Sequence, residues 1–388
     1  MKTNSKLVRL GTICTVVSGT TPDTNNASYW NGDLPWITPA EIEETSYVVC
    51  QTARCITKQA VNKKSLNLLP KGTVLLSSRA PIGKVAIAGI DMYCNQGFKN
   101  LICSPKIYNE YLYFFLKAKT EYLKSLGRGA TFKEISKSIV ENILIPLPDI
   151  KTQKRIAERL DKVQKLIALQ KEQLKKLDNL IKSRFIDLFG DPITNSENWE
   201  LQQLVDIADV TSSKRIFEKE YVDSGIPFFR TKEIVELEQG LAPSTKIFIT
   251  KARYDEIKAQ FGIPQAGDLL ISAVGTIGHI WIVPKDFSFY FKDGNLLWIK
   301  KPQYNSIFLR YLLPILVKHE ISHVASGTAY QALTINKLGQ TLVPLCPIKL
   351  QTQFADFVTK IEAQKGLLTT RLSHLETLYK SLMQEYFG

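Results

Sequence analysis

The chain has 388 residues, of which 44% are hydrophobic and 22% charged, and its formal net charge at pH 7 is +13. This length suits two or three domains, and the composition is that of an ordinary folded protein. No apolar run reaches the ~20 residues of a membrane span, and residues 1–10 lack the apolar core of a signal peptide. We therefore expect a cytoplasmic protein with no membrane partner.

The positive charge is concentrated early in the chain. Lys+Arg minus Asp+Glu is 18 − 10 for residues 1–148, 11 − 6 for 149–190, 16 − 17 for 191–346 and 5 − 4 for 347–388. A polyanion such as nucleic acid suits the first two segments, because Lys and Arg release counterions from phosphates. The third segment could bind nucleic acid only through a local basic patch.

The six cysteines stand at positions 14, 50, 55, 94, 103 and 346, without a CxxC pair. This spacing matches neither a zinc site nor a redox motif. We expect buried, reduced thiols.

The first globular segment, residues 1–149, alternates short β-like runs with turn signals. Residues 72–87 predict a strand, a glycine-bearing loop and a second strand. A helix is predicted over 111–126, followed by the loop 127–133, a short helix, and a strand that leaves through Pro146 and Pro148.

Residues 150–189 contain no Gly or Pro and predict one long helix. Apolar residues repeat with alternating spacings of four and three, which predicts a coiled-coil seam on a rod of roughly 60 Å. The seam residues are Ile156, Leu160, Val163, Ile167, Leu174, Leu177 and Ile181. Leu166, Leu169, Leu180 and Phe185 widen the stripe, so we expect them to be exposed until partner helices cover them, which would make the isolated chain poorly soluble.

The second globular segment, residues 191–346, repeats this order. Residues 267–282 correspond to 72–87, and residues 227–234 echo 35–42. A helix is predicted over 307–324, followed by the loop 326–332 and a proline-bearing exit at 343–347. The loops differ between the copies while the strands agree, as expected where one scaffold serves two targets.

The final segment, residues 347–388, repeats the long helix at a constant offset of 198, with Gln153, Leu169 and Leu180 recurring as Gln351, Leu367 and Leu378. Its seam residues are Phe354, Val358, Ile361, Leu368, Leu372, Leu375 and Tyr379, and Lys365 interrupts them. Because a globular segment separates the helices, an antiparallel coiled coil with pseudo-two-fold symmetry is the economical arrangement. The alternative is that each helix packs only on its own domain.

The glycine loops expose backbone N–H groups beside cationic side chains, a combination that suits DNA phosphates, while neighbouring polar groups suit base edges. Each residue taken alone could equally be a solvated surface group. The candidate DNA-binding residues are Arg79, Lys84, Lys99, Arg128, Thr131, Lys133, Lys214, Arg215, Arg230, Lys232, His279, Lys292, Thr328, Tyr330 and Gln331.

One catalytic motif is present: residues 319–323 read His-Glu-Ile-Ser-His, the HExxH pattern of zinc proteases. We find no convincing third metal ligand, because His374 lies far downstream inside the second long helix. No Walker A sequence and no glycine-rich nucleotide loop occur. A zinc metalloprotease and a coiled-coil adaptor that only assembles proteins stay open as alternatives to a DNA-binding protein.

The stretch from Gly129 through the Pro-Leu-Pro exit at 146–148 into the helix that carries Gln153, together with its repetition, resembles the specificity subunit of type I restriction-modification systems. The resemblance covers the whole chain and implies an α+β protein. Two tandem α/β target-recognition domains, residues 1–149 and 191–346, would be joined by two long helices, residues 150–190 and 347–388. Cys346 and Lys365 depart from the expected pattern.

The resemblance also implies a function. The chain would be non-catalytic, would hold no cofactor or metal, and would bind double-stranded DNA, with each recognition domain reading half of a bipartite target. The coiled coil would set the spacer and dock partners. Two modification subunits would bring S-adenosylmethionine, and two restriction subunits would add ATP with Mg²⁺.

Overall fold

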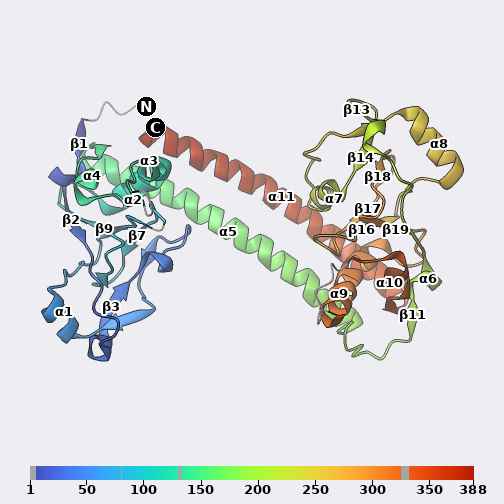
Figure 1. Ribbon diagram of the computed structural model, residues 1–388, viewed down its shortest axis with the longest axis horizontal. Helices are drawn as coiled ribbons and strands as arrows, with labels where there is room; N and C mark the ends of the chain where they lie inside the picture. Colours follow the sequence, from blue (N-terminus) through green and yellow to red (C-terminus); the bar gives the residue numbers. More distant parts are fainter. Residues whose placement is uncertain (1–5, 80, 130–132, 325–331) are drawn as a thin grey trace. The chain divides into compact units, whose positions relative to one another are not determined.

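The computed structural model describes residues 6–79, 81–129, 133–324 and 332–388, apart from the side chains of residues 322–324. The chain divides into two compact units, which we call unit 1 (Met1–Glu172 with Thr369–Gly388) and unit 2 (Gln173–Leu368). Helices α5 (Ile150–Phe189) and α11 (Ile348–Phe387) each contribute a part to both units (Figure 1). Thr131, Thr328, Tyr330 and Gln331 lie outside the described residues.

The main sheet of unit 1 has the strand order β2-β9-β6-β7-β4. Neighbouring strands are antiparallel except β4 and β7, which are parallel. The helices α2 and α4 contact this sheet. The bounds are β2 (Cys14–Ser18), β4 (Val48–Val49), β6 (Val74–Leu76), β7 (Val85–Ala88), β9 (Lys99–Cys103), α2 (Asn109–Ala118), α3 (Thr120–Ser125) and α4 (Lys137–Glu141).

The single helix predicted over 111–126 is wrong, because the chain forms two helices with a break at Lys119. Lys119 has φ −99° and ψ 16°, outside the helical range. The Thr120 hydroxyl donates to the carbonyl oxygen of Lys117 at 2.9 Å. Such a local hydrogen bond competes with regular helix geometry, which the apolar pattern could not reveal.

A smaller sheet completes the globular part of unit 1, with the strand order β5-β3-β8. Trp30, Trp36, Ile56 and Tyr93 form its core with Ala60. The bounds are η2 (Ala27–Tyr29), β3 (Trp30–Ile37), η3 (Pro39–Glu41), β5 (Arg54–Ile56), α1 (Lys58–Lys64) and β8 (Tyr93–Cys94).

Unit 2 repeats this plan with a sheet of order β12-β19-β16-β17 and a smaller sheet of order β13-β15-β14-β18. The predicted helix over 307–324 is confirmed as α9, which continues through Pro314. The bounds are α6 (Leu204–Ile207), β12 (Asp209–Thr211), η4 (Glu218–Glu220), β13 (Tyr221–Val222), β14 (Ile226–Phe229), α7 (Thr231–Glu238), β15 (Phe248–Ile249), α8 (Lys251–Phe261), β16 (Leu269–Ser272), β17 (Ile280–Ile282), β19 (Leu296–Lys300), β18 (Tyr290–Phe291), α9 (Ser306–Val324) and α10 (Ile335–Gln340).

The predicted strand, loop and strand over 72–87 and 267–282 are confirmed as the antiparallel pairs β6–β7 and β16–β17. Gly83 and Gly278 close the two loops with φ of 93° and 91°, a conformation that favours glycine. In both loops a serine hydroxyl accepts from the residue that follows this glycine: Ser77 from the Lys84 N–H at 2.8 Å, and Ser272 from the His279 N–H at 2.9 Å.

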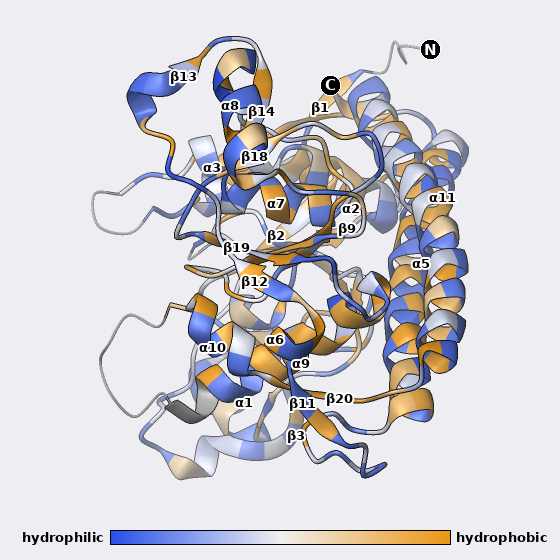
Figure 2. Ribbon diagram, turned by 90° about the vertical axis from the view of Figure 1, so that its right-hand side faces the viewer, coloured by the Kyte–Doolittle hydropathy of each residue, from blue (hydrophilic) through white to orange (hydrophobic). Residues whose placement is uncertain are grey.

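The two long helices pair antiparallel within each unit. In unit 1, Arg159 donates to the hydroxyl of Tyr386 at 3.0 Å, and Lys171 pairs with Glu376 at 2.8 Å, so the residue number falls on α11 as it rises on α5. Hydrophobic residues recur along both helices (Figure 2). In unit 2, Phe185 and Phe189 of α5 contact Phe354 of α11.

The end of each helix packs on the domain that the other helix follows. Phe387, at the end of α11, contacts Tyr111 and Phe115 of α2 in unit 1. Phe189, at the end of α5, lies 4.6 Å from Phe308 of α9 between ring centroids in unit 2. The alternative in which each helix packs only on its own domain is therefore wrong.

Two expectations about the helices need correction. Phe185, expected to be exposed, is buried and stacks on Phe308, whereas Leu166, Leu169 and Leu180 are exposed as expected. Lys365, which interrupts the seam, pairs with Asp178 at 2.7 Å and with Glu362 at 3.0 Å. The lysine therefore joins α5 to α11 by an ion-pair network, which the spacing of apolar residues could not show.

Each long helix starts from an equivalent anchor. Strand β1 (Leu7–Arg9) pairs with β10 (Leu144–Pro146), and β11 (Leu201–Gln203) pairs with β20 (Leu342–Pro344), immediately before the helices begin. Gln153 and Gln351 are fully buried near the two helix starts. The side-chain oxygens accept from the backbone N–H groups of Tyr108 and Asn305, both at 2.8 Å.

All six cysteines are free thiols, as expected. The expected burial is confirmed for Cys14, Cys94 and Cys346, but it is wrong for Cys50, which is exposed. Among the described helices, none combines the length and apolarity that crossing a bilayer requires.

Candidate nucleic-acid interface

Lys84 and His279 occupy the same place in the two units, directly after the loop glycine. The Lys84 ammonium donates to the carbonyl oxygen of Pro39 at 3.0 Å. The His279 Nδ1 lies 2.6 Å from a carboxylate oxygen of Glu238. Equivalent backbones thus present two different basic side chains, each held by the segment that follows β3 or β14.

Four of the predicted residues gather beside one loop of unit 1. The backbones of Arg128 and Glu134 pair across residues 128–134, and the Lys99 ammonium lies 2.9 Å from the Glu134 carboxylate. The Lys99 hydrogen bond holds the pKa of Glu134 below its usual range. Arg79 approaches the same carboxylate at 4.0 Å, while Arg128 and Lys133 are exposed.

Lys99 is 8% exposed, so its ammonium serves an internal ion pair. Its burial argues against a phosphate contact, which needs a side chain that the solvent reaches. Arg128 and Lys133 are better placed, because both side chains are exposed next to the Lys99–Glu134 ion pair.

In unit 2 a second group forms where the parallel strands β14 and β18 end. Arg230 follows β14, Lys292 follows β18, and the N–H of Lys292 donates to the carbonyl oxygen of Phe229 at 2.9 Å. Arg215 reaches Asp293 at 2.9 Å. The parallel register thus brings together three basic residues that are far apart in sequence.

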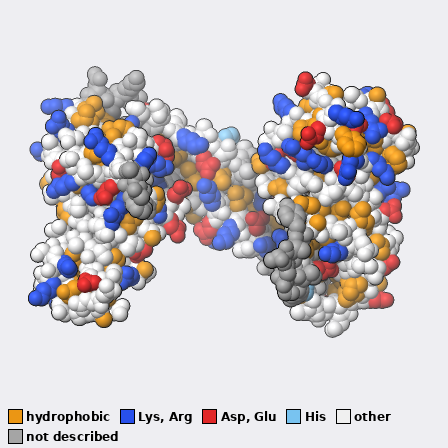
Figure 3. Space-filling model, viewed as in Figure 1, with side chains coloured by type: hydrophobic (Ala, Val, Ile, Leu, Met, Phe, Trp, Pro, Cys, Tyr) orange, Lys and Arg blue, Asp and Glu red, His pale blue; other side chains and the backbone are white. Residues whose placement is uncertain are grey.

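The availability of these cations differs. Arg230 pairs with the buried carboxylate of Glu233 at 3.2 Å, and Lys232 approaches Glu236 at 4.0 Å. Lys214 is exposed and its ammonium lies 4.5 Å from the centroid of the Phe261 ring. Figure 3 shows Lys and Arg side chains gathered around the part of unit 2 that carries β13, β14 and α8.

Sequence reasoning missed Arg54 on β5. Its guanidinium carbon lies 3.7 Å from the centroid of the Trp30 ring, and the residue is exposed. The sequence could not indicate the contact between Arg54 and Trp30, because residues 30 and 54 meet only through the pairing of β3 with β5.

The long helices carry exposed leucines on one flank. In unit 1 these are Leu166, Leu169 and Leu378, and in unit 2 they are Leu180 and Leu367. Each stands one residue before a seam position, with position 170 filled by the polar Gln170. Within each unit the exposed leucines therefore border the antiparallel seam from the same side. We call this surface the leucine flank. Leu169 and Leu180 recur as Leu367 and Leu378, so the exposed leucines belong to the duplicated pattern.

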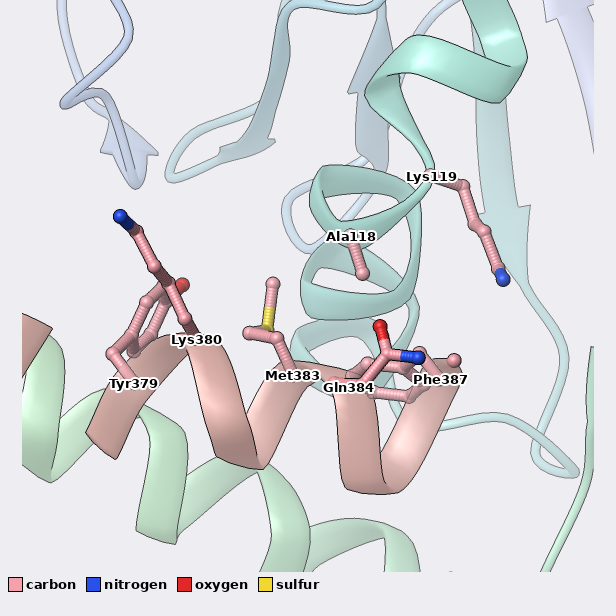
Figure 4. A pocket seen from close by; sticks show the side chains of 8 residues that line it. Ala118, Lys119, Tyr379, Lys380, Met383, Gln384 and Phe387 are labelled. Carbon is pink, nitrogen blue, oxygen red and sulfur yellow. The ribbon is translucent and has the colours of Figure 1, made fainter. Parts of the chain in front are cut away.

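A pocket of about 290 Å³ lies in unit 1 between the end of α2 and the last turns of α11. In Figure 4, Met383 points from α11 toward Ala118, while the ends of Lys119 and Lys380 point outward. The lining residues are Ala118, Lys119, Tyr379, Lys380, Met383, Gln384, Phe387 and Gly388. No carboxylate or histidine side chain belongs to this lining.

The HExxH residues lie on α9 as expected. The Thr341 hydroxyl donates to the Glu320 carboxylate at 3.4 Å, and burial raises the pKa of Glu320. Within the described residues, which exclude the side chain of His323, no group of three His, Cys, Asp or Glu could hold a metal ion.

The family model described as the type I restriction modification DNA specificity domain matches this chain twice, over residues 2–179 and over residues 196–377. The chain is 33% identical over 373 residues to the type I restriction enzyme MjaIX specificity subunit of Methanocaldococcus jannaschii, covering 88% of this chain and 83% of that relative. It is 31% identical over 160 residues to the EcoR124I/EcoR124II specificity subunit of Escherichia coli, covering 39% of each.

Solved structures agree on the fold. The S subunit of a type I restriction-modification system from M. genitalium matches with a TM-score of 0.62 at 16% identity, covering 100% of this chain and 98% of that one. A chain from a structural study of type I system assembly matches with a TM-score of 0.58 at 19% identity, covering 100% and 98%. Both matches include the globular segments as well as the helices. The chain therefore belongs to the family of type I restriction-modification specificity subunits, the DNA-recognition subunits of these systems.

Proposed function

We propose that each unit reads one half of a bipartite DNA target while partner subunits carry out the chemistry. The observation that carries this proposal is the pair of equivalent hairpin loops, whose hydrogen bonds agree and whose basic side chains, Lys84 and His279, differ. A repeated scaffold with different side chains at its equivalent positions suits two half-sites of different sequence.

Within this proposal, exposed cations without an acidic partner are the preferred phosphate contacts. Among the residues that the structure describes, Arg128 and Lys133 meet this description in unit 1, and Lys214 does in unit 2. A cation that already pairs with a carboxylate must exchange that partner before it can bind phosphate, which lowers the gain. Arg79, Arg215 and Arg230 therefore serve better as groups that order the loops or read bases. His279, which is hydrogen-bonded to Glu238, serves the same purpose.

The leucine flank supports docking of other subunits. Exposed leucines that recur at equivalent positions in two helices indicate a common apolar partner, because contiguous apolar side chains at a surface are typical of interaction sites. Each unit carries one copy of this flank, so we propose that one modification subunit docks on each, giving two per chain. Two restriction subunits would complete the assembly.

The chemistry belongs to these partners in our proposal. Modification subunits would bind S-adenosylmethionine and methylate the DNA, and restriction subunits would use ATP with Mg²⁺. The present chain would contribute DNA recognition without a catalytic residue of its own.

A domain exchange tests the DNA-reading proposal. Residues 1–148 are replaced by the first recognition domain of another family member, and the methylated sequence in cells is determined. One half of the methylated motif should change, while the other half and the spacer stay the same. A change in both halves, or in neither, would refute independent reading by the two units.

Leucine substitutions test the docking proposal. Leu169→Ser with Leu378→Ser removes two of the three leucines of the flank of unit 1, and the mass of the complex with its modification subunit is measured under native conditions. One bound modification subunit should be lost, and adding Leu180→Ser with Leu367→Ser should release the second. Leu68→Ser and Leu241→Ser remove exposed leucines outside the flank and should change nothing. Retention of both subunits by the fourfold variant would refute the assigned surface.

A further inference from the structure

Arg54 lies on a platform of two tryptophans in unit 1. It begins β5 and stands opposite Trp36 in the register of β3 with β5. Its guanidinium carbon lies 3.7 Å from the centroid of Trp30 and 5.6 Å from that of Trp36. The arginine is exposed, whereas the tryptophans are 8% and 2% exposed.

The two tryptophan side chains are fixed by their contact with each other and by hydrogen bonds to the backbone. The tryptophan rings meet edge to face, with centroids 5.1 Å apart and planes at 83°. The Trp30 Nε1 donates to the carbonyl oxygen of Asp23 at 3.0 Å, and the Trp36 Nε1 donates to that of Thr20 at 3.2 Å. Because both indoles are fixed, the guanidinium rests on a rigid surface, and less conformational entropy is lost when it binds a ligand.

The hydrogen-bonding edge of Arg54 has no acidic partner among the described residues. Arg79, Arg215 and Arg230, by contrast, lie within 4.0 Å of carboxylates. A guanidinium carries its five N–H donors in its plane, so stacking on a ring occupies a face and leaves the donors available. The chain thus presents a planar, oriented and uncompensated donor set at its surface.

We propose that Arg54 is a DNA-contacting residue of unit 1 that binds a pair of acceptor oxygens or nitrogens in bidentate geometry. Two groups on DNA supply such a pair: the O6 and N7 atoms of guanine, and two oxygens of one phosphate. This inference rests on the proposed function and deepens it by naming the residue and the chemistry it recognises.

The bound sequence must first be identified with the full wild-type chain in complex with its modification subunits. Duplexes selected from a randomised pool should converge on one bipartite motif. If the wild-type complex selects no sequence, the proposed function itself fails, independently of Arg54.

The test then uses Arg54→Met, which keeps an apolar stem on Trp30 and removes the donors, and Arg54→Lys, which keeps the charge. Arg9→Ala removes the same charge from another exposed position of unit 1 and serves as the matched control. Thermal unfolding of each variant shows whether the small sheet remains folded.

Arg54→Met should weaken binding of the selected duplex by roughly 5- to 150-fold, which corresponds to the range for one bidentate contact. If the ligand is guanine, preference should relax at one base pair, and Arg54→Lys should not restore it. If the ligand is phosphate, all duplexes should lose affinity alike, the slope of log affinity against log salt should fall by about one, and Arg54→Lys should restore part of it. Folded Arg54→Met and Arg54→Lys proteins with wild-type affinity, motif and salt slope, like Arg9→Ala, would overturn the proposal.

Discussion

At the scale of residues, the duplicated glutamines show how one side chain joins a helix to its domain. The Gln153 amide donates to the carbonyl oxygens of Lys106 and Pro148 at 3.1 and 2.8 Å, and its oxygen accepts from Tyr108. Gln351 makes the equivalent contact to Asn305 and donates to Cys346 at 2.8 Å. Identity between the copies at this position thus has a structural reason.

Gln153→Ala should lower the free energy of unfolding of unit 1 by about 3 kcal/mol, because several buried backbone groups lose their partners. Urea denaturation of the full chain measures the loss in free energy of unfolding. Hydrogen exchange in α2 shows whether this loss arises in unit 1. Gln170→Leu is the matched comparison on the same helix: the Gln170 side-chain oxygen accepts no hydrogen bond, and its counterpart in α11 is Leu368. That substitution should leave stability equal or raise it, and equal losses from both variants would contradict the anchoring role.

Glu134 adds a pH dependence. The Lys99 hydrogen bond lowers the pKa of Glu134 in the folded state, so the ionised carboxylate stabilises the fold above the unfolded pKa of about 4.3. This stability is lost as the pH falls through the lower folded pKa. Glu134→Gln should therefore be less stable than the wild type by about 1 kcal/mol at pH 7, and the difference should shrink below pH 4. Denaturation at pH 7, 5 and 3.5 tests this, and a constant difference would exclude the ion pair as its source.

At the scale of elements, each long helix serves two cores. The early part of α5 packs Ile156 and Leu160 into the core of unit 1, and its end packs Phe185 and Phe189 into that of unit 2. The helix α11 does the converse. Continuous apolar spacing predicted the two long helices correctly. It also predicted that Phe185 is exposed, which is wrong because Phe308 of α9 covers this side chain.

Phe387→Ala should destabilise unit 1, although the substitution lies at the other end of the chain. Removing a buried phenylalanine costs about 3–5 kcal/mol, and here the lost contacts include Tyr111 and Phe115. Hydrogen exchange should increase in α2 and leave α9 unchanged. Phe189→Ala should show the reverse pattern, with α9 affected and α2 protected. The same pattern from both variants would contradict the exchange of helix ends.

At the scale of the whole molecule, the helix pair is expected to set the distance between the half-sites. A heptad inserted at matched places in both helices adds about 10.5 Å, near three base pairs. The spacer in the methylated motif should lengthen with both half-sites unchanged, unless the added rotation of roughly 100° abolishes methylation. Insertion in one helix alone should destabilise the chain, because it breaks the paired seam. Full methylation with an unchanged spacer in the double insertion would show that the helices do not set this distance.

The sequence alone determined the duplication, the two long helices and the repeated strand–loop–strand, because periodicity and a constant offset depend only on the order of residues along the chain. Resemblance to specificity subunits followed from the same patterns. Candidate basic residues could be named, but their availability could not, since Lys99, Arg230 and His279 meet their carboxylates only after folding.

Tertiary structure decided which side chains face outward and which residues meet. Arg54 and Trp30 are 24 positions apart and come together through strand register, and Phe387 enters the core of unit 1 through antiparallel helix pairing. Both outcomes depend on packing between segments distant in the chain. Local patterns carry no information about that packing, because the spacing of apolar residues specifies a buried face without specifying what buries it.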